Sequence, residues 1–211
     1  VITPEQAGSF EATLEACKTA NKKFIMDAGN GFYSCIFPFT GGLKIDGFED
    51  ADGIPTQKFT EYDEAEVVAT LQAFSKLMHD YKGTFQALST DSISSGFAAG
   101  TCGAGIDGSW NTVTNQEALG EKFGAAKLPT IEVNGEAKQM VSMLGYKFLG
   151  VNGSTKFPRA SQILAHYLAG EECQRQRATD LGWGPSNTVV NSEPVVTESA
   201  VLTAIAEQGK F

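Results

Sequence analysis

Aromatic side chains beside glycines are the residues whose type and spacing best suit a chemical task. Trp110 closes a Gly-Ser-Trp turn, Trp183 stands between two glycines, and Tyr33 follows a Gly-Phe pair. A ring held in a turn offers a flat apolar face on which the axial C–H groups of a pyranose can stack. The sugar hydroxyls need planar polar partners, and Asp107 and Asn111 lie close to Trp110 in the sequence. The pattern predicts carbohydrate binding.

Burial in a hydrophobic core is the alternative for each of these rings. We favour the core for Phe32, Phe37 and Phe39, because phenylalanine carries no polar group and is often fully buried. For Tyr33, burial in the core and sugar binding are about equally expected. Binding is favoured for the two tryptophans, because loops carry function more often than they bury large side chains.

Catalytic and metal-binding patterns are missing from the sequence. It has no G-x-S-x-G, G-x-x-x-x-G-K-[ST] or H-E-x-x-H pattern. Residues 103–108 match G-x-G-x-x-G, but the match lies within an expected strand and does not follow one, as the dinucleotide-binding pattern requires. The four cysteines form no C-x-x-C pair, and only two histidines are present, too few for an ordinary zinc site. We therefore expect no catalytic residue, no metal and no cofactor. Cys102 is expected to be a core thiol, but the sequence leaves open whether the cysteines are reduced or form disulfides.

The composition is that of a folded, acidic protein. The 211 residues, 42% of them hydrophobic, are enough to bury a core. Sixteen basic and twenty-five acidic residues give a formal net charge of −9 without any block of like charges. This balance argues against nucleic acid as a partner and favours a neutral or cationic ligand. No stretch has the roughly 20 apolar residues of a membrane-spanning helix, and the first residues do not resemble a signal peptide.

Helices that alternate with short strands make up the expected secondary structure. Thr3 is expected to cap a helix that begins at Pro4, and Val67, Leu71 and Phe74 mark one face of the longest helix. Further helices are expected at residues 90–100, 115–120, 158–170, 171–179 and 197–208, and strands at 24–26, 101–107, 124–133 and 141–151. Turns with a small hairpin are expected within residues 45–56, and a capping box at residues 60–63. The alternation favours an α/β architecture.

The segment from Thr90 to Trp110 reads T-D-S-I-S-S-G-F-A-A-G-T-C-G-A-G-I-D-G-S-W. It resembles a segment of the maltose/maltodextrin-binding proteins of bacterial ABC sugar importers, in which a helix ending in F-x-x-G precedes a strand of small residues and a G-x-W turn. The resemblance continues in order at residues 31–38, 128–130, 158–170 and 181–186. It implies that Trp110 stacks on bound sugar, that Asp107 is its polar neighbour, and that Tyr33 supplies a second ring.

The resemblance also implies a fold and a division of the chain. The fold is α/β, a lobe of the type II periplasmic-binding-protein kind with a small mixed β-sheet flanked by helices, truncated at both ends. Residues 1–130 are expected to form the C-terminal lobe, and residues 131–184 a crossover segment that belongs to the missing N-terminal lobe. Residues 185–211 are expected to return to the C-terminal lobe.

As a member of that family, the complete protein is expected to bind a malto-oligosaccharide and to present it to an ABC permease. It is expected outside the cytoplasm, as a cell-surface lipoprotein or in the periplasm. Two readings from other classes are a stand-alone carbohydrate-binding or adhesion module and a thiol or serine hydrolase. The helical content argues against the flat all-β platform of the first, and no serine–histidine pair supports the second.

A crossover segment without its own lobe is expected to find another partner. We expect residues from about 130 to 180 to pack non-natively on the C-terminal lobe or to pair with a second copy of the chain, as a homodimer or segment swap. Analytical ultracentrifugation with limited proteolysis distinguishes the two. A strict monomer whose segment resists protease contradicts the pairing.

Overall fold

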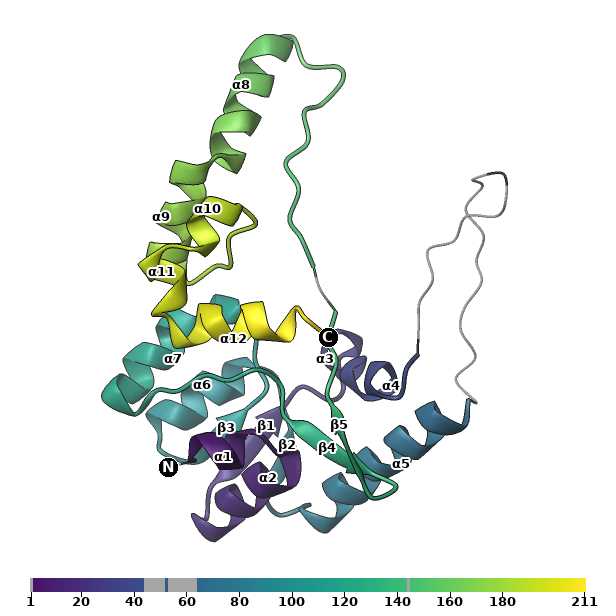
Figure 1. Cartoon of the computed structure of the whole chain (residues 1–211). Coiled ribbons are helices and arrows are strands. Elements are labelled where there is room, and N and C mark those ends of the chain that lie inside the picture. Colours follow the sequence, from purple (N-terminus) through teal and green to yellow (C-terminus); the bar gives the residue numbers. More distant parts are fainter. Residues whose placement is uncertain (1, 44–51, 53–63, 144) are drawn as a thin grey trace. The chain divides into compact units, whose positions relative to one another are not determined.

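The computed structural model describes residues 2–43, 52, 64–143 and 145–211, and it divides the chain into two units (Figure 1). The first unit consists of residues 1–107, 128–143 and 211, and the second of residues 108–127 and 144–210. The turns and hairpin expected within residues 45–56 and the capping box expected at residues 60–63 lie outside the described residues, apart from residue 52.

A three-stranded parallel sheet forms the centre of the first unit. Strand β1 (Lys23–Met26) lies between β2 (Phe85–Ala87) and β3 (Cys102–Gly105) and pairs in parallel with both. The sequence predicted β1 and β3 but not β2, because a strand of only three residues shows no periodicity. The predicted small sheet flanked by helices is confirmed, and this sheet is purely parallel.

Helices cover both faces of this sheet. Phe24 and Met26 of β1 join the larger core, whereas Ile25, which points to the opposite face, packs with Ile93 and Cys102. The helices of the first unit are α1 (Pro4–Ala7), α2 (Phe10–Thr19), α3 (Gly31–Ser34), α4 (Ile36–Thr40), α5 (Ala65–Asp80) and α6 (Asp91–Ala98). A strand buried on both faces is typical of a parallel sheet between two helical layers.

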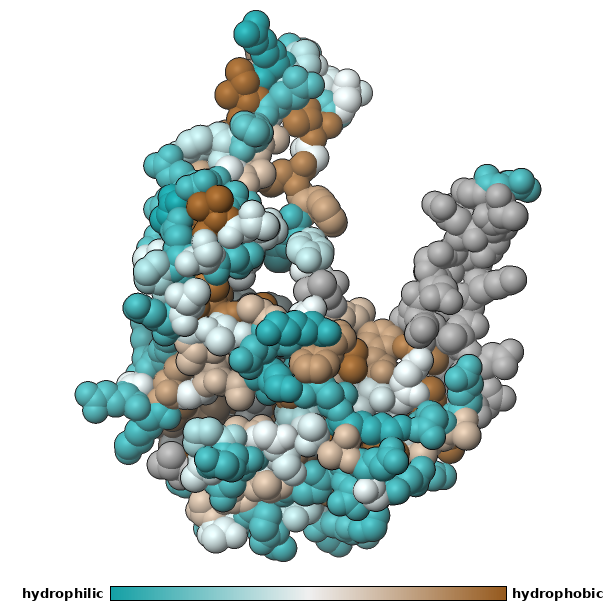
Figure 2. Space-filling model, in the orientation of Figure 1, coloured by the Kyte–Doolittle hydropathy of each residue, from teal (hydrophilic) through white to brown (hydrophobic). Residues whose placement is uncertain are grey.

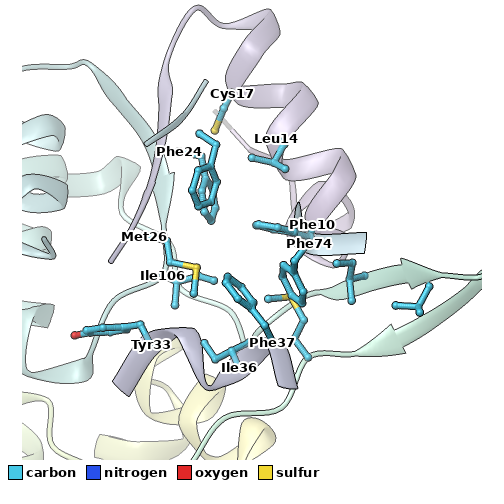
Figure 3. Packing of buried hydrophobic residues seen from close by; sticks show 14 residues of the cluster. Phe10, Leu14, Cys17, Phe24, Met26, Tyr33, Ile36, Phe37, Phe74 and Ile106 are labelled. Atoms are coloured by element: carbon cyan, nitrogen blue, oxygen red, sulfur yellow. The ribbon is translucent and has the colours of Figure 1, made fainter. Parts of the chain in front are cut away.

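The larger core is built around phenylalanine rings from elements far apart in the sequence (Figure 3). The ring centre of Phe10 on α2 lies 5.2 Å from that of Phe24 and 5.7 Å from that of Phe74 on α5. Phe37 on α4 lies 3.9 Å from Phe74, centre to centre. The helical spacing that predicted α5 thus marks the face that it buries.

The predicted first helix is present but divided. The hydroxyl of Thr3 accepts a hydrogen bond from the Gln6 amide, and the Gln6 side chain accepts one from the Thr3 amide, so the expected N-cap is confirmed. Helix α1 ends at Gly8, and Ser9 caps a new helix, α2, by accepting from the Ala12 amide. Two capping residues within seven positions therefore give two helices.

An antiparallel hairpin of β4 (Thr130–Val133) and β5 (Glu136–Gln139) completes the first unit. Its turn is Asn134-Gly135, with φ of 54° and 85°, the positive values that a tight two-residue hairpin turn requires. The sequence analysis predicted β4 but missed β5, although Asn-Gly is a strong hairpin signal. The strand expected at residues 141–151 is wrong for the described residues of that range, which form no regular structure.

The hairpin moves the expected boundary at residue 130. Ile131, Val133 and Met140 are fully buried in the larger core, so the first unit extends to residue 143. Apolar residues from β4 and beyond β5 are therefore part of this core and are not free to join another lobe. Of the expected crossover segment, only residues 144–184 would then belong to the missing N-terminal lobe, and this assignment stays a prediction.

The second unit is helical in its described residues. Its elements are η1 (Ser109–Asn111), α7 (Thr112–Leu119), η2 (Gly120–Lys122), α8 (Pro158–Ala169), α9 (Glu171–Leu181), α10 (Thr188–Asn191), α11 (Pro194–Thr197) and α12 (Ala200–Gln208). Helices were predicted at α7, α8, α9 and α12, whereas the one-turn helices α10 and α11 were missed. Runs of four residues are too short to show a helical period.

Helix α9 packs on the C-terminal helices of the second unit. Ala178 of α9 packs with Val196 and Leu202, and the Arg175 guanidinium donates two hydrogen bonds of 2.6 Å to the Glu193 carboxylate. These contacts tie α9 to α11 and α12. Residues 144–184 and 185–210 consequently belong to one unit.

The four cysteines are free thiols, and the two buried ones lie on opposite faces of β3. A β-carbon built on Gly96 would lie 2.7 Å from that of Cys102, whereas one built on the next strand residue, Gly103, would lie 3.1 Å from the sulfur of Cys17. The strand itself separates the two thiols. The structure therefore answers the open question in favour of free thiols and confirms Cys102 as a core thiol.

We predict that the native chain reacts with a water-soluble thiol reagent at Cys35 and Cys173 well before it reacts at Cys17 and Cys102. Burial raises the pKa of Cys17 to about 11 and that of Cys102 to about 12. Their protonated forms stabilise the fold below the ordinary thiol pKa near 9, and this stability is lost as the pH rises toward 11 and 12. Mass spectrometry of timed samples at pH 8 measures the order in which the four cysteines react, and the denatured chain, in which all four are accessible, is the control. Equal rates at all four sites in the native chain would contradict it.

Candidate functional site

The carboxyl edge of the parallel sheet gathers polar residues from three separate parts of the chain. Asp27 directly follows β1, Thr90 and Asp91 follow β2 after two or more residues, and Asp107 follows β3 after Ile106. Parallel strands end at the same edge, so these residues meet there although they are up to 80 positions apart. Open parallel sheets bind their ligands at this edge.

Tyr33 on α3 interacts with this group through its hydroxyl. Its ring belongs to the larger core, and Figure 3 shows its hydroxyl pointing away from the cluster. Burial raises the pKa of Tyr33, the negative charges of Asp107, Asp27 and Asp91 raise it further, and a hydrogen bond with Thr90 opposes them. All four polar residues of the edge therefore act on one hydroxyl.

Phe32, for which we favoured the core, has the exposed position that the family resemblance assigned to Tyr33. Phe32 is 52% exposed, whereas Tyr33 is 7% exposed, and the two rings meet edge to face at 5.3 Å. Neighbouring residues of a helix point about 100° apart, so one turn cannot direct both rings outward. The core role expected for Phe32 is therefore wrong, and the open aromatic face belongs to Phe32 instead of Tyr33.

The backbone holds Phe32 in place at the start of α3. The Asn30 side chain caps the helix by accepting a hydrogen bond from the Phe32 amide at 3.0 Å. The Cys35 thiol donates to the Phe32 carbonyl at 3.0 Å. An exposed ring fixed in this way loses little conformational freedom when a ligand stacks on it.

Trp110 occupies a tight turn at the start of the second unit and is 52% exposed. A β-carbon on Gly108 would lie 2.2 Å from the Cζ2 atom of Trp110, so the indole lies directly over the Gly108 backbone. The Asn111 amide donates to the Gly108 carbonyl at 3.1 Å, and the Thr112 hydroxyl donates to the Ser109 carbonyl at 2.6 Å. Glycine at position 108 is thus what allows the ring to take this position.

Trp183 follows Gly182, which takes the left-handed conformation with φ of 63°. A β-carbon on Gly182 would lie 3.2 Å from the Thr112 side chain, so the turns that carry the two tryptophans touch within the second unit. The indole is 37% exposed, and the Lys147 ammonium lies 5.8 Å from its ring centre. This cation–π contact leaves at most one face of Trp183 open to a sugar.

The five expected site residues fall into two groups. Tyr33 and Asp107 belong to the first unit, and Trp110, Asn111 and Trp183 to the second. The sequence analysis missed Asp27, Thr90, Asp91 and the exposed face of Phe32. A polar residue directly after a buried strand would have been the signal for Asp27, whereas Thr90 and Asp91 follow a strand that the sequence analysis did not predict. Among the described residues, no group of histidine, cysteine and acidic side chains could hold a metal ion, and no helix is long and apolar enough to cross a membrane.

We predict that Gly108→Ala displaces the indole of Trp110 without unfolding the chain. The added methyl group would overlap the ring, and an exposed ring can rotate away at a cost of about 1 kcal/mol or less. Near-ultraviolet circular dichroism and tryptophan fluorescence should change while the far-ultraviolet spectrum stays constant. Gly124→Ala is the matched control, because nothing lies within 4 Å of its added methyl group. An unchanged near-ultraviolet spectrum in Gly108→Ala would show that the Trp110 ring does not lie over the Gly108 backbone.

Solved structures of maltodextrin-binding proteins share this fold. A structure in complex with acarbose is 25% identical, with a TM-score of 0.83, and the match covers 100% of this chain and 53% of the other. The maltodextrin-binding protein MalE1 from L. casei BL23 is 21% identical, with a TM-score of 0.77 over 99% of this chain and 53% of its own. The maltose/maltodextrin-binding domain MalE from Bdellovibrio bacteriovorus, bound to maltotriose, is 18% identical, with a TM-score of 0.64 over 100% of this chain and 55% of its own.

This chain thus spans about half the length of the solved structures that it matches. No curated protein sequence matches it. The profile of one family, described as bacterial extracellular solute-binding protein, matches residues 3–204. A family of solute-binding proteins confirms the prediction of a binding protein that is not an enzyme. Nearly the whole chain is matched, and it belongs to the bacterial extracellular solute-binding protein family.

Proposed function

We propose that this chain binds a glucan of the malto-oligosaccharide type. The similar structures include proteins bound to acarbose, maltotetraose and maltotriose. Each unit supports the proposal by itself, because the first has the exposed Phe32 ring and polar side chains after its strands, and the second has the exposed rings of Trp110 and Trp183 beside Asn111 in the sequence. Aromatic faces and polar groups are the two kinds of contact that a sugar needs.

The observation that carries the proposal is the position of Trp110. Its ring is large, half exposed and held over the Gly108 backbone by a hydrogen-bonded turn. A large apolar ring normally gains about 1.5–3 kcal/mol by burial, so a folded chain that holds one outward forgoes that gain. A ligand that covers the ring recovers it.

Each site residue takes a role that fits its exposure. We propose that Trp110 and the open face of Trp183 stack on sugar rings, while Asp107 and Asn111 accept hydrogen bonds from sugar hydroxyls. Phe32 takes the stacking role first assigned to Tyr33, because its ring is the exposed one of the pair. Tyr33 contributes its hydroxyl group instead.

A large apolar surface on the second unit supports the assignment of residues 144–184 to a missing lobe. Helix α8 buries no residue, and Phe148 in the preceding segment is 89% exposed. Figure 2 shows hydrophobic side chains on the surface around α8. The exposed apolar side chains there are Tyr146, Phe148, Leu149, Val151, Phe157, Ile163, Leu164 and Tyr167. Water-soluble proteins seldom expose so much contiguous apolar surface, and the matched structures contain about as much chain again.

The role of the complete protein extends this proposal. We propose that it delivers its sugar to an ABC permease and acts outside the cytoplasm, as a cell-surface lipoprotein or in the periplasm. The extracellular description of the family supports the location. No observation favours a stand-alone carbohydrate-binding or adhesion module.

Replacing Trp110 by alanine tests the proposal. We expect Trp110→Ala to raise the Kd for maltotriose about tenfold or more, since a buried stacking ring contributes at least about 1.4 kcal/mol. Isothermal titration of the complete natural protein measures the change. Trp110→Phe should restore part of the affinity, and Val113→Ala, an exposed apolar residue on α7, should leave it unchanged. An unaltered Kd in Trp110→Ala would remove Trp110 from the proposed site. If the complete natural protein does not bind maltotriose, the proposed function is wrong.

A further inference from the structure

The Trp183 ring is carried by a loop that joins α9 to α10 in the second unit, residues 182–187. The two glycines beside the tryptophan contact other elements of the same unit. A β-carbon built on Gly182 would lie 3.2 Å from the Thr112 side chain of α7, and one built on Gly184 would lie 3.5 Å from a side chain of α12. The start of the loop is therefore supported on both sides of the ring.

The end of the loop is held by one side chain, that of Gln174 on α9. Its Oε1 atom accepts hydrogen bonds from the Ser186 amide at 2.8 Å and from the Asn187 amide at 2.9 Å. The Ser186 hydroxyl donates to the same oxygen at 3.3 Å. Both amides come before the first residue of α10, so that helix offers them no acceptor, and the Gln174 carbonyl supplies one.

The nitrogen of the Gln174 side chain fixes this oxygen in place. Nε2 donates at 2.6 Å to the carbonyl of Ala169, the last residue of α8. Carbonyls at the end of a helix have no partner within the helix, so this one is free to accept from a side chain. Helix α9 is also tied to α8 directly, because Arg177 donates to the Leu168 carbonyl at 2.7 Å. The loop thus ends at a point that is fixed to two helices.

A loop that is held at both ends presents the residue in its middle in a defined position. Trp183 stands between two glycines, the residue type that leaves a loop the widest choice of backbone conformations. Without the hydrogen bonds to Gln174, the ring would have to be ordered when a ligand binds, at a cost in conformational entropy. Bonds that order the loop in advance remove this cost from the binding step.

We propose that Gln174 is a positioning residue for sugar binding, which orders the loop so that the open face of Trp183 is ready to stack on the sugar. Gln174 itself does not touch the sugar and acts through the loop. The inference rests on the proposed function, because it requires Trp183 to be part of the sugar site. Order of this kind raises the affinity without adding a contact to the ligand.

The test measures the Kd for maltotriose by calorimetry on the complete natural protein and its variants. Gln174→Ala removes the bonds to the loop and to Ala169, whereas Gln174→Glu keeps an oxygen that accepts from the loop and loses only the donor to Ala169. Gln176→Ala is the matched control. Gln176 is exposed on the same helix, and its side chain makes no hydrogen bond in the part of the chain that the structure describes.

Far-ultraviolet circular dichroism verifies that each variant is folded. If Gln174→Ala does not fold, Gln174→Asn takes its place in every comparison. Asparagine keeps the amide group but is too short to reach Ala169 and the loop at the same time.

We expect Gln174→Ala to raise the Kd about fivefold, the effect of losing about one net hydrogen bond. Gln174→Glu and Gln176→Ala should stay within about twofold of the parent, because a carboxylate accepts from backbone amides at least as well as an amide oxygen does. Trp183→Ala should raise the Kd about fivefold or more. In the Trp183→Ala background, Gln174→Ala should add less than about twofold, because a residue that acts through the ring has no effect once the ring is removed.

Four results overturn the positioning role and leave the proposed function standing, because maltotriose still binds to the parent in each. The first is an unchanged Kd in Gln174→Ala, and the second is an equal rise with and without the Trp183 ring. The third is a Gln174→Glu variant that binds as weakly as Gln174→Ala, which would assign the effect to Ala169. The fourth is a parental Kd in Trp183→Ala. If the parent does not bind maltotriose, the proposed function fails and the positioning role fails with it.

Discussion

The burial of β1 on both faces is the constraint on which the first unit depends. A strand with Phe24 and Met26 on one face and Ile25 on the other needs a helical layer on each side. Parallel pairing with β2 and β3 satisfies its backbone and requires a crossover of some length between the strands, which the helices provide. The order of helices and strands along the chain follows from this single requirement.

The same constraint places the candidate site. Because the three strands run in one direction, the residues that follow them meet at one edge, where the charges of Asp27, Asp91 and Asp107 and a hydrogen bond with Thr90 act on the Tyr33 hydroxyl. At the other edge, the ammonium groups of Lys22 and Lys23 donate hydrogen bonds to the carbonyls of Gly100 and Gly83.

Glycine residues also shape the structure, because they allow a helix or a large side chain to approach a backbone closely. Gly96 lets α6 approach the Cys102 side chain, and Gly108 lets the indole of Trp110 rest over the main chain. The small-residue segment between these two glycines is the part of the sequence that resembles a known family most specifically. Its resemblance has a physical basis, because a β-carbon on Gly103 would lie 3.0 Å from a neighbouring atom and one on Gly105 would lie 2.7 Å from one.

The sequence by itself determined the class of the fold, the ends of most long helices and the position of Trp110 in a turn outside the core. These depend on local signals, namely helical periodicity, capping residues and glycine-flanked turns, which act over a few residues. Only the tertiary structure decided that Tyr33 is buried and Phe32 exposed, that β2 and β5 exist, and that Ile131 and Met140 belong to the first unit. It also brought three aspartates from distant segments to one hydroxyl. Burial and strand pairing depend on partners tens of residues away, so no local pattern carries that information.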